Sequence, residues 1–233
     1  MEDVDQPVLL VLAGPNGAGK STVAPAFIQM SGVGEFVNAD EIAKGLSAFH
    51  PESVALQAGQ LAIERMNQLG QARRSFAIET TLAARTYVGM IKRLRAEGYR
   101  VILVYVWLSN VELAIQRVSD RVRAGGHHIE DDVVRRRYQA GLDNLFDLYI
   151  PQVDKWIVCD GSSVKGALVI ASGCFDTIQM VAHPMVWEVL KHGVTREPKL
   201  REGFEPGGDA DLGLSPIDFS GNPDPHGPRT PDG

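Results

Sequence analysis

The stretch GPNGAGKST at residues 14–22 constrains the fold most, because it directly follows the continuous apolar run VLLVLA at residues 8–13. It matches the P-loop pattern G-x-x-x-x-G-K-[ST] without a gap. Glycines let backbone N–H groups turn toward an anion without Cβ clashes, and a helix beginning at Lys20 points its positive end at the same place. The dinucleotide pattern G-x-G-x-x-G fails, since Thr22 stands at its last position. The stretch therefore predicts a phosphate cradle.

In this cradle we expect Lys20 to reach the β- and γ-phosphates of ATP, and the Ser21 hydroxyl to be a ligand of Mg²⁺. The remaining predicted nucleotide-binding residues are Gly14, Asn16, Gly17, Ala18, Gly19 and Thr22. ATP and Mg²⁺ are thus the predicted ligands. A P-loop alone does not distinguish a kinase from a nucleotide-dependent switch.

Strand and helix signals alternate up to about residue 160. The strands are expected at 8–13, 35–40, 75–81, 100–108 and 155–161, and the helices at 20–30, 51–70, 86–98, 110–126 and 130–151. This alternation predicts an α/β domain with a parallel sheet and helices on both faces. We expect residues 162–192 to add one strand and one helix.

The chain divides by composition into an N-terminal extension (1–7), one domain (8–195) and a tail (196–233). Six of the thirteen prolines lie between residues 206 and 233, among glycines and aspartates, which predicts disorder there. The net charge is −6, and about −4 of it lies in this stretch. The nearly neutral body disfavours long nucleic acid as a partner.

Cysteine usage and hydropathy indicate where the protein works. Cys159 and Cys174 are too few for a disulfide framework and lack metal-ligand spacing. The acidic N-terminus is no signal peptide, and no apolar run approaches the about 20 residues of a membrane span. We expect a cytoplasmic protein with no membrane partner.

Polar residues end two of the predicted strands at the edge that faces the ligand in parallel α/β sheets. Asp40 follows the second strand, where it can accept a proton from an attacking hydroxyl or cap the helix that EIAKGL begins. Glu79 and Thr81 end the third strand. They can hold substrate hydroxyls or support Mg²⁺, or simply mark a strand that breaks into a loop.

A basic stretch at 117–137 predicts a phosphoryl-transfer lid. Two helices joined by the glycine-containing loop AGGHHIEDD carry six arginines within 21 positions: Arg117, Arg121, Arg123, Arg135, Arg136 and Arg137. Such arginines offset the charge that develops on a transferred phosphoryl group. The alternative is a solvated helix face paired to nearby acids. His127 and His128 are interpreted as a polar lid tip, and Asp160 as a turn residue before Gly161.

In order and spacing, the P-loop, NADEIA, IETTL, YVWL, RVRAGGHHI and RRRY resemble the bacterial zeta-toxin family of small kinases, over roughly residues 8–161. The resemblance implies a nucleoside-kinase-like P-loop fold of three layers with a helical lid. It also implies ATP–Mg²⁺-dependent phosphorylation of a hydroxyl, in the best-known members that of UDP-N-acetylglucosamine. A small antitoxin protein is the partner that such a toxin would have.

The same resemblance assigns roles to individual positions. Asp40 matches the catalytic base, and Lys20 and Ser21 match the nucleotide-binding positions. Glu79 and Thr81 match substrate-binding positions, although this chain has Glu-Thr-Thr where the toxins have Glu-Gly-Thr. Glu64 resembles a further substrate-contacting acid, or is a plain surface glutamate. Arg121 and Arg136 are the expected lid arginines, with Arg117 and Arg137 as alternatives.

The sequence therefore predicts an ATP-dependent phosphotransferase that acts on a small-molecule hydroxyl, with a nucleotide sugar such as UDP-N-acetylglucosamine as the expected acceptor. One alternative changes the acceptor to another metabolite, a nucleoside or a polynucleotide end. A second alternative is a nucleotide-dependent interaction module without catalysis. Substitution of Asp40 separates the last alternative from a kinase.

Overall fold

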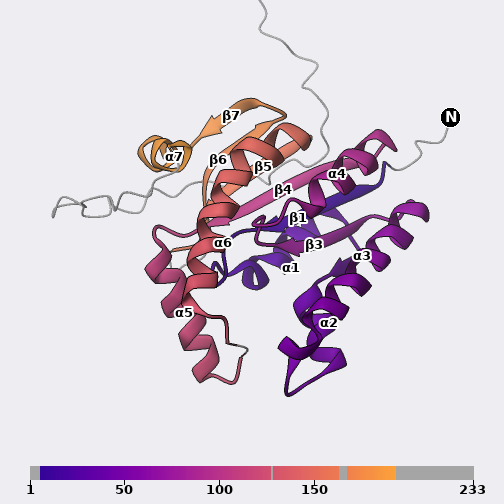
Figure 1. Cartoon of the computed structure of the whole chain (residues 1–233). Coiled ribbons are helices and arrows are strands. Elements are labelled where there is room, and N and C mark those ends of the chain that lie inside the picture. Colours follow the sequence, from indigo (N-terminus) through magenta and orange to yellow (C-terminus); the bar gives the residue numbers. More distant parts are fainter. Residues whose placement is uncertain (1–5, 127, 163–166, 193–233) are drawn as a thin grey trace, which may run out of the picture. The chain divides into compact units, whose positions relative to one another are not determined.

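A computed structural model describes residues 6–126, 128–162 and 167–192 of the 233-residue chain (Figure 1). In this part the strands form one sheet in the order β2-β3-β1-β4-β5-β6-β7. The strands are β1 (Val8–Ala13), β2 (Glu35–Val37), β3 (Phe76–Thr80), β4 (Arg100–Trp107), β5 (Lys155–Asp160), β6 (Leu168–Cys174) and β7 (Thr177–Val181). The order places β1, and hence the P-loop, in the middle of the parallel strands.

Strands β1 to β5 pair in parallel, which confirms the predicted α/β sheet. Beyond β5 the predicted helix is present, but two strands lie where the sequence predicted one. Two strands, β6 and β7, pair antiparallel there and are followed by a helix. Short connections explain the difference, because a tight turn joins antiparallel strands whereas a parallel pair needs a long crossover.

The helices are α1 (Lys20–Ser31), α2 (Ala39–Leu46), α3 (Ala55–Gln71), α4 (Thr86–Ala96), α5 (Val111–Arg123), α6 (Asp131–Asn144) and α7 (Pro184–Lys191). Pro51–Val54 form a 3₁₀ turn before α3, and a π turn, Leu145–Tyr149, and a 3₁₀ turn, Ile150–Gln152, continue α6. The second predicted strand ends at Val37 because the Asn38 side chain caps α2. A π turn in a helix often marks a functional position.

Both faces of the sheet are covered, so the domain has three layers. One face packs β1 and β4 side chains against α3, α4 and the π turn, with Leu9, Met66 and Leu94 in its core. The smaller core on the other face contains Val106 of β4 and Val118 of α5. All residues of β1 are buried, as a continuous apolar run at the centre of a parallel sheet predicts.

Aromatic side chains pack α7 against the part of the sheet that contains β5. The rings of Trp156 on β5 and Trp187 on α7 stack with centroids 5.4 Å apart, and Phe146 packs against Trp187. The predicted tail at 196–233 and residues 1–5 of the predicted N-terminal extension lie outside the described residues. Within the described ranges, none of the helices has the length and hydropathy of a membrane span.

Candidate active site

The P-loop connects β1 to α1 in a conformation that requires its glycines. Gly14, Gly17 and Gly19 all have positive φ angles. A Cβ atom on Gly14 would lie 2.2 Å from the carbonyl oxygen of Val106 on β4, so only glycine fits there. The Gly14 N–H donates a hydrogen bond to the Thr80 carbonyl at the end of β3. The loop is therefore fixed between its two neighbouring strands.

Lys20 begins α1 and is buried, with 7% of its side chain exposed. Its Nζ donates to the carbonyl oxygens of Gly14 at 2.9 Å and Pro15 at 3.0 Å, and lies 3.7 Å from Oε1 of Glu79. Burial lowers the pKa of Lys20, while Glu79 and Asp40 counteract this and Arg121 adds to it. The ammonium group thus lies within electrostatic reach of two carboxylates and one lid arginine.

Glu79 is the residue on which the site converges. It lies near the end of β3, 14% exposed, next to Lys20. Its Oε2 accepts hydrogen bonds from Ser21 Oγ at 3.4 Å and from Asn38 Nδ2 at 3.0 Å. This arrangement places Glu79 on the phosphate and metal side of the site, which favours the second of its two predicted roles, support of Mg²⁺.

The residues of the cradle fit ATP and Mg²⁺. Mg²⁺ prefers oxygen ligands, and the Ser21 hydroxyl and the Glu79 carboxylate supply them next to the phosphate-binding lysine. Asn16 is buried and its Oδ1 lacks a hydrogen-bond partner among the described residues. Rotation of that amide would present its NH₂ group to a phosphate. None of the described residues forms a group of three or more His, Cys, Asp or Glu that could hold a metal by itself.

Asp40 lies in the first turn of α2 and is exposed. The cap of this helix is Asn38, whose Oδ1 accepts from the Asp40 N–H at 2.8 Å and from the Glu41 N–H at 3.4 Å. Asp40 is therefore not the cap itself, and its carboxylate is left available for another role. Asn38 bonds both this turn and Glu79, so it joins the predicted base to the P-loop side of the site.

Residues 81–85 after β3, called the acceptor loop below, are held from the opposite side by α6 and the π turn. Asn144 donates through Nδ2 to the carbonyls of Leu82 at 2.7 Å and Ala83 at 3.3 Å, and the Tyr149 hydroxyl donates to the Ala84 carbonyl at 2.7 Å. Leu82 is fully buried with a positive φ of 57°. Thr81, in the same loop, is half-buried and accepts from the Ala83 N–H at 3.4 Å.

The arginines of the predicted lid differ in their contacts and exposure. Arg135 on α6 forms a two-point ion pair with Glu112 on α5, at 2.5 and 2.9 Å, which ties the two lid helices together. Arg136 is exposed and Arg137 half-buried, and neither bonds to another of the described residues. Arg121 acts on the pKa of Lys20, so it lies on the cradle side of α5. His127, part of the predicted lid tip, lies outside the described residues.

Arg117 has a position that the lid pattern did not predict. Its guanidinium donates to the carbonyls of Gly161 at 2.7 Å, Ser162 at 2.9 Å and Gly17 at 3.4 Å. It therefore ties the P-loop to the segment after β5, and these bonds leave it poorly suited to reach a γ-phosphate. Arg117 lies four residues before Arg121 on the same helix, so the sequence alone does not show that the two arginines have different contacts.

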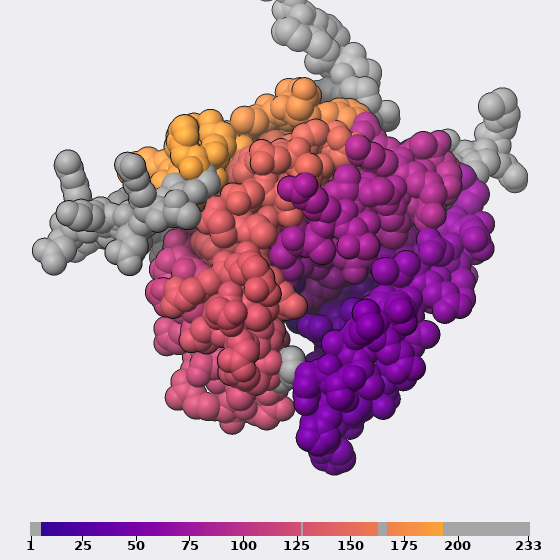
Figure 2. All heavy atoms as spheres, in the orientation of Figure 1, coloured from indigo at the N-terminus to yellow at the C-terminus, as the bar shows by residue number. Residues whose placement is uncertain are grey.

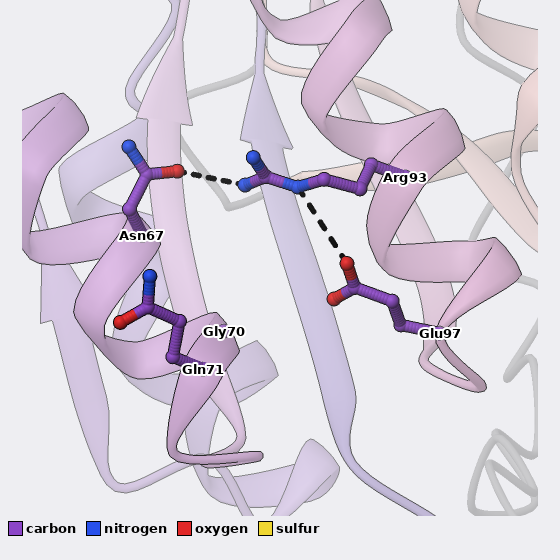
Figure 3. A pocket seen from close by; sticks show the side chains of 5 residues that line it. All are labelled: Asn67, Gly70, Gln71, Arg93 and Glu97. Atoms are coloured by element: carbon purple, nitrogen blue, oxygen red, sulfur yellow. Dashed lines mark hydrogen bonds and ion pairs between the residues drawn. The ribbon is translucent and has the colours of Figure 1, made fainter.

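Glu64 is exposed on α3, where Gln68 donates to it at 3.4 Å, and its predicted acceptor contact stays a prediction. A cavity of about 260 Å³ lies between the C-terminal turns of α3 and α4 and is lined by Asn67, Gly70, Gln71, Arg93 and Glu97 (Figure 3). Arg93 donates to Asn67 at 2.7 Å within it. Helices that follow parallel strands end at the opposite edge of the sheet, so this cavity is distinct from the P-loop site.

Figure 2 shows the surface hollowed between the purple segment that contains α2 and α3 and the pink-to-salmon segment that contains α5 and α6. Indigo atoms from the first part of the chain form the floor of this hollow. A site of this form can receive a donor nucleotide on the P-loop and a second molecule next to α2. The lid helices stand on its other side.

Comparison with known proteins identifies a family and a fold that agree with the P-loop and the sheet described above. The family model described as Zeta toxin matches residues 1–158. An uncharacterized protein of Haemophilus influenzae is 30% identical over 125 residues, which are 54% of this chain and 88% of that protein. The similarity thus extends over the P-loop, α2 and the lid helices.

Two solved structures share the fold. The AvrRxo1-ORF1:-ORF2 structure with ATP has a TM-score of 0.63 at 19% identity, and the match covers 81% of this chain but only 64% of that one. A structure of the PezAT chromosomal toxin-antitoxin system of Streptococcus pneumoniae has a TM-score of 0.57 at 16% identity and covers 80% and 79% of the two chains. Because the family model matches more than half of its length, the chain belongs to the zeta toxin family.

Proposed function

We propose that the protein transfers the γ-phosphoryl group of ATP to a hydroxyl of a small molecule, and that the acceptor is a nucleotide sugar such as UDP-N-acetylglucosamine. The observation that carries the proposal is the run of contacts from Lys20 through Glu79 and Asn38 to the turn that bears Asp40. It connects a phosphate-binding lysine to an exposed carboxylate beside the same hollow. A switch that only binds nucleotide has no need of that carboxylate.

On the donor side, the P-loop N–H groups and Lys20 hold the β- and γ-phosphates. Ser21 and Glu79 hold Mg²⁺, which offsets the negative charge of the phosphates when it is bound. The ion pair with Glu79 keeps Lys20 at the cradle even though burial disfavours its charge. Lys20 exchanges its bonds to the loop carbonyls for bonds to phosphate oxygens when ATP binds.

On the acceptor side, Asp40 takes the proton from the attacking hydroxyl. The acceptor oxygen then bonds to the γ-phosphorus, and the bond from that phosphorus to the bridging oxygen of ADP breaks. Arg121 and Arg136 offset the charge on the transferred group as the lid closes and excludes water. Thr81 and Glu64 are the proposed further contacts to the acceptor.

A small protein that covers the ATP site is the proposed partner, since two of the similar structures are an ORF1:-ORF2 pair and a toxin-antitoxin system. ATP as donor and two free cysteines suit a cytoplasmic activity. The partner and the location both depend on the proposed reaction.

The test is a transfer assay with purified protein, Mg–ATP and a panel of hydroxyl acceptors that begins with UDP-N-acetylglucosamine. Mass spectrometry detects the gain of one phosphoryl group. Asp40→Asn should lower the rate by about 10²- to 10⁴-fold with ATP binding retained. Glu41→Gln is the matched control, because this neighbouring carboxylate lies in the same helical turn and pairs only with Lys44 among the described residues.

The outcomes separate the hypotheses. Product that disappears in Asp40→Asn and persists in Glu41→Gln supports the reaction and its base. Equal rates in Asp40→Asn and the wild type would refute the role of Asp40. Release of ADP without transfer to any acceptor would favour a nucleotide-dependent interaction module.

A further inference from the structure

Tyr87 lies in the first turn of α4, two residues after the acceptor loop. The loop is fixed by Asn144 and Tyr149, as described above, so the start of α4 has a fixed place at the ligand edge of the sheet. The ring of Tyr87 is half-buried and packs against the larger core. A side chain anchored in this way loses little further freedom when a ligand binds to it.

Tyr87 and Asp40 lie at the same edge of the sheet, because β2 and β3 are paired parallel strands and the helices that follow them begin beside these residues. Ala39 and Ile42 flank Asp40 on α2, and they pack against the same core as Tyr87 and Val88 on α4. Burial raises the pKa of Tyr87, and the Asp40 carboxylate raises it further. Burial raises the pKa of Tyr149 and Tyr87 raises it further, and the Tyr149 hydroxyl bonds to Ala84 in the acceptor loop.

The hydroxyl of Tyr87 has no hydrogen-bond partner in the ranges that the structure describes. The other tyrosines of this region differ. Tyr149 donates to Ala84, and Tyr138 donates to the Leu108 carbonyl at 2.6 Å. Polar groups at partly buried positions are normally satisfied by protein or solvent. An anchored phenol without a protein partner, beside the proposed base, is a donor available to a ligand.

We propose that the Tyr87 hydroxyl binds the acceptor, donating a hydrogen bond to an oxygen next to the hydroxyl that Asp40 deprotonates. This inference rests on the proposed kinase reaction. It favours acceptors with neighbouring oxygens, such as sugars and other polyols, over simple alcohols, because two contacts fix the orientation of the attacking group. Tyr87 is thus a residue that determines acceptor specificity, on a helix that follows β3 rather than the P-loop strand β1.

The experiment compares Tyr87→Phe with the wild type in the transfer assay, with UDP-N-acetylglucosamine or whichever acceptor of the panel the wild type phosphorylates. Loss of one neutral hydrogen bond should raise the KM for the acceptor roughly five- to tenfold, with the KM for ATP and the melting temperature unchanged. The same variant should discriminate less between polyol acceptors and simple alcohols.

Tyr99→Phe is the matched control. Its hydroxyl donates to the carbonyls of Leu69 and Arg74 beside the N-terminal end of β4, so this variant should lose stability without any change in acceptor KM. Equal acceptor KM values for Tyr87→Phe and the wild type would overturn the inference and leave the proposed function intact. Transfer by the wild type to none of the acceptors would overturn both.

Discussion

Gly141 on α6 offers a sharp test of how the lid is attached to the catalytic edge. A Cβ atom at this position would lie 2.4 Å from the Thr81 carbonyl oxygen and 3.8 Å from the Tyr105 hydroxyl. Real Cβ atoms do not approach a backbone oxygen so closely, and a carbonyl cannot rotate away as a side chain does. In Gly141→Ala either α6 or the acceptor loop must therefore move.

The expected magnitude follows from opposing effects. Alanine favours a helix by about 1 kcal/mol over glycine. Overpacking against backbone costs about 1–3 kcal/mol, and the displacement also weakens the bonds from Asn144 to Leu82 and Ala83, each of which contributes about 1 kcal/mol. We expect the free energy of unfolding of Gly141→Ala to fall by about 2 kcal/mol in total.

Gly89 on α4 is the matched control, because a Cβ atom there would meet nothing within 4 Å. Gly89→Ala should gain up to about 1 kcal/mol from helix propensity alone. The two variants should then differ by about 3 kcal/mol, or about 6–12 °C in melting temperature. Urea and thermal unfolding followed by circular dichroism measure both quantities. Gly141→Ala as stable as Gly89→Ala would refute the close contact between α6 and the acceptor loop.

Two further predictions concern the donor side. Arg117→Lys cannot reproduce the guanidinium bonds to Gly17, Gly161 and Ser162, so the KM for ATP should rise about tenfold. Arg123→Lys is the control and should leave this KM unchanged, because Arg123 is exposed and pairs with Asp120. An unchanged KM for ATP in Arg117→Lys would contradict the proposed role of Arg117 in holding the P-loop. In the folded protein the pKa of Lys20 lies below its ordinary value of 10.5. At a pH between the pKa of the folded state and that of the unfolded state, the unfolded chain binds more protons than the folded one. The contribution of Lys20 to the free energy of unfolding therefore rises with pH over this range. The wild type should gain stability relative to Lys20→Met over that alkaline range in urea titrations, and a constant difference would show that folding does not lower the pKa of Lys20.

Local patterns predicted the donor half of the molecule well. The buried run at β1, the glycines of the loop and the helix that begins at Lys20 depend on a few neighbouring residues each, and the structure shows this strand, loop and helix in the predicted order. Glu79 was predicted as a site residue, but the sequence did not decide whether it lies on the phosphate side or the acceptor side of the site. Its contacts to Lys20, Ser21 and Asn38 favour the phosphate side.

The contacts that sequence reasoning missed join residues far apart in the chain. Asn144 lies 62 positions from Leu82, and Arg117 lies 44 positions from Gly161, so neither bond leaves a local pattern. Asn38 was passed over for Asp40 because either residue suits a helix cap in sequence alone. Only one of the two antiparallel strands β6 and β7 was predicted, since the exposed Leu168, Ile178 and Met180 blur the alternation that marks a strand.

The strand order has a consequence for how such a protein can change. The segments proposed to hold the nucleotide follow β1, β4 and β5. The residues proposed to face the acceptor, Asp40, Thr81 and Tyr87, follow β2 and β3 on the other side of β1. Substitutions on the β2–β3 side can therefore alter which molecule is phosphorylated while the nucleotide half remains as it is. An ancestral protein with one nucleotide-binding half can in this way give rise to enzymes that phosphorylate different acceptors. Each new acceptor would require only a few substitutions on the β2–β3 side of the sheet.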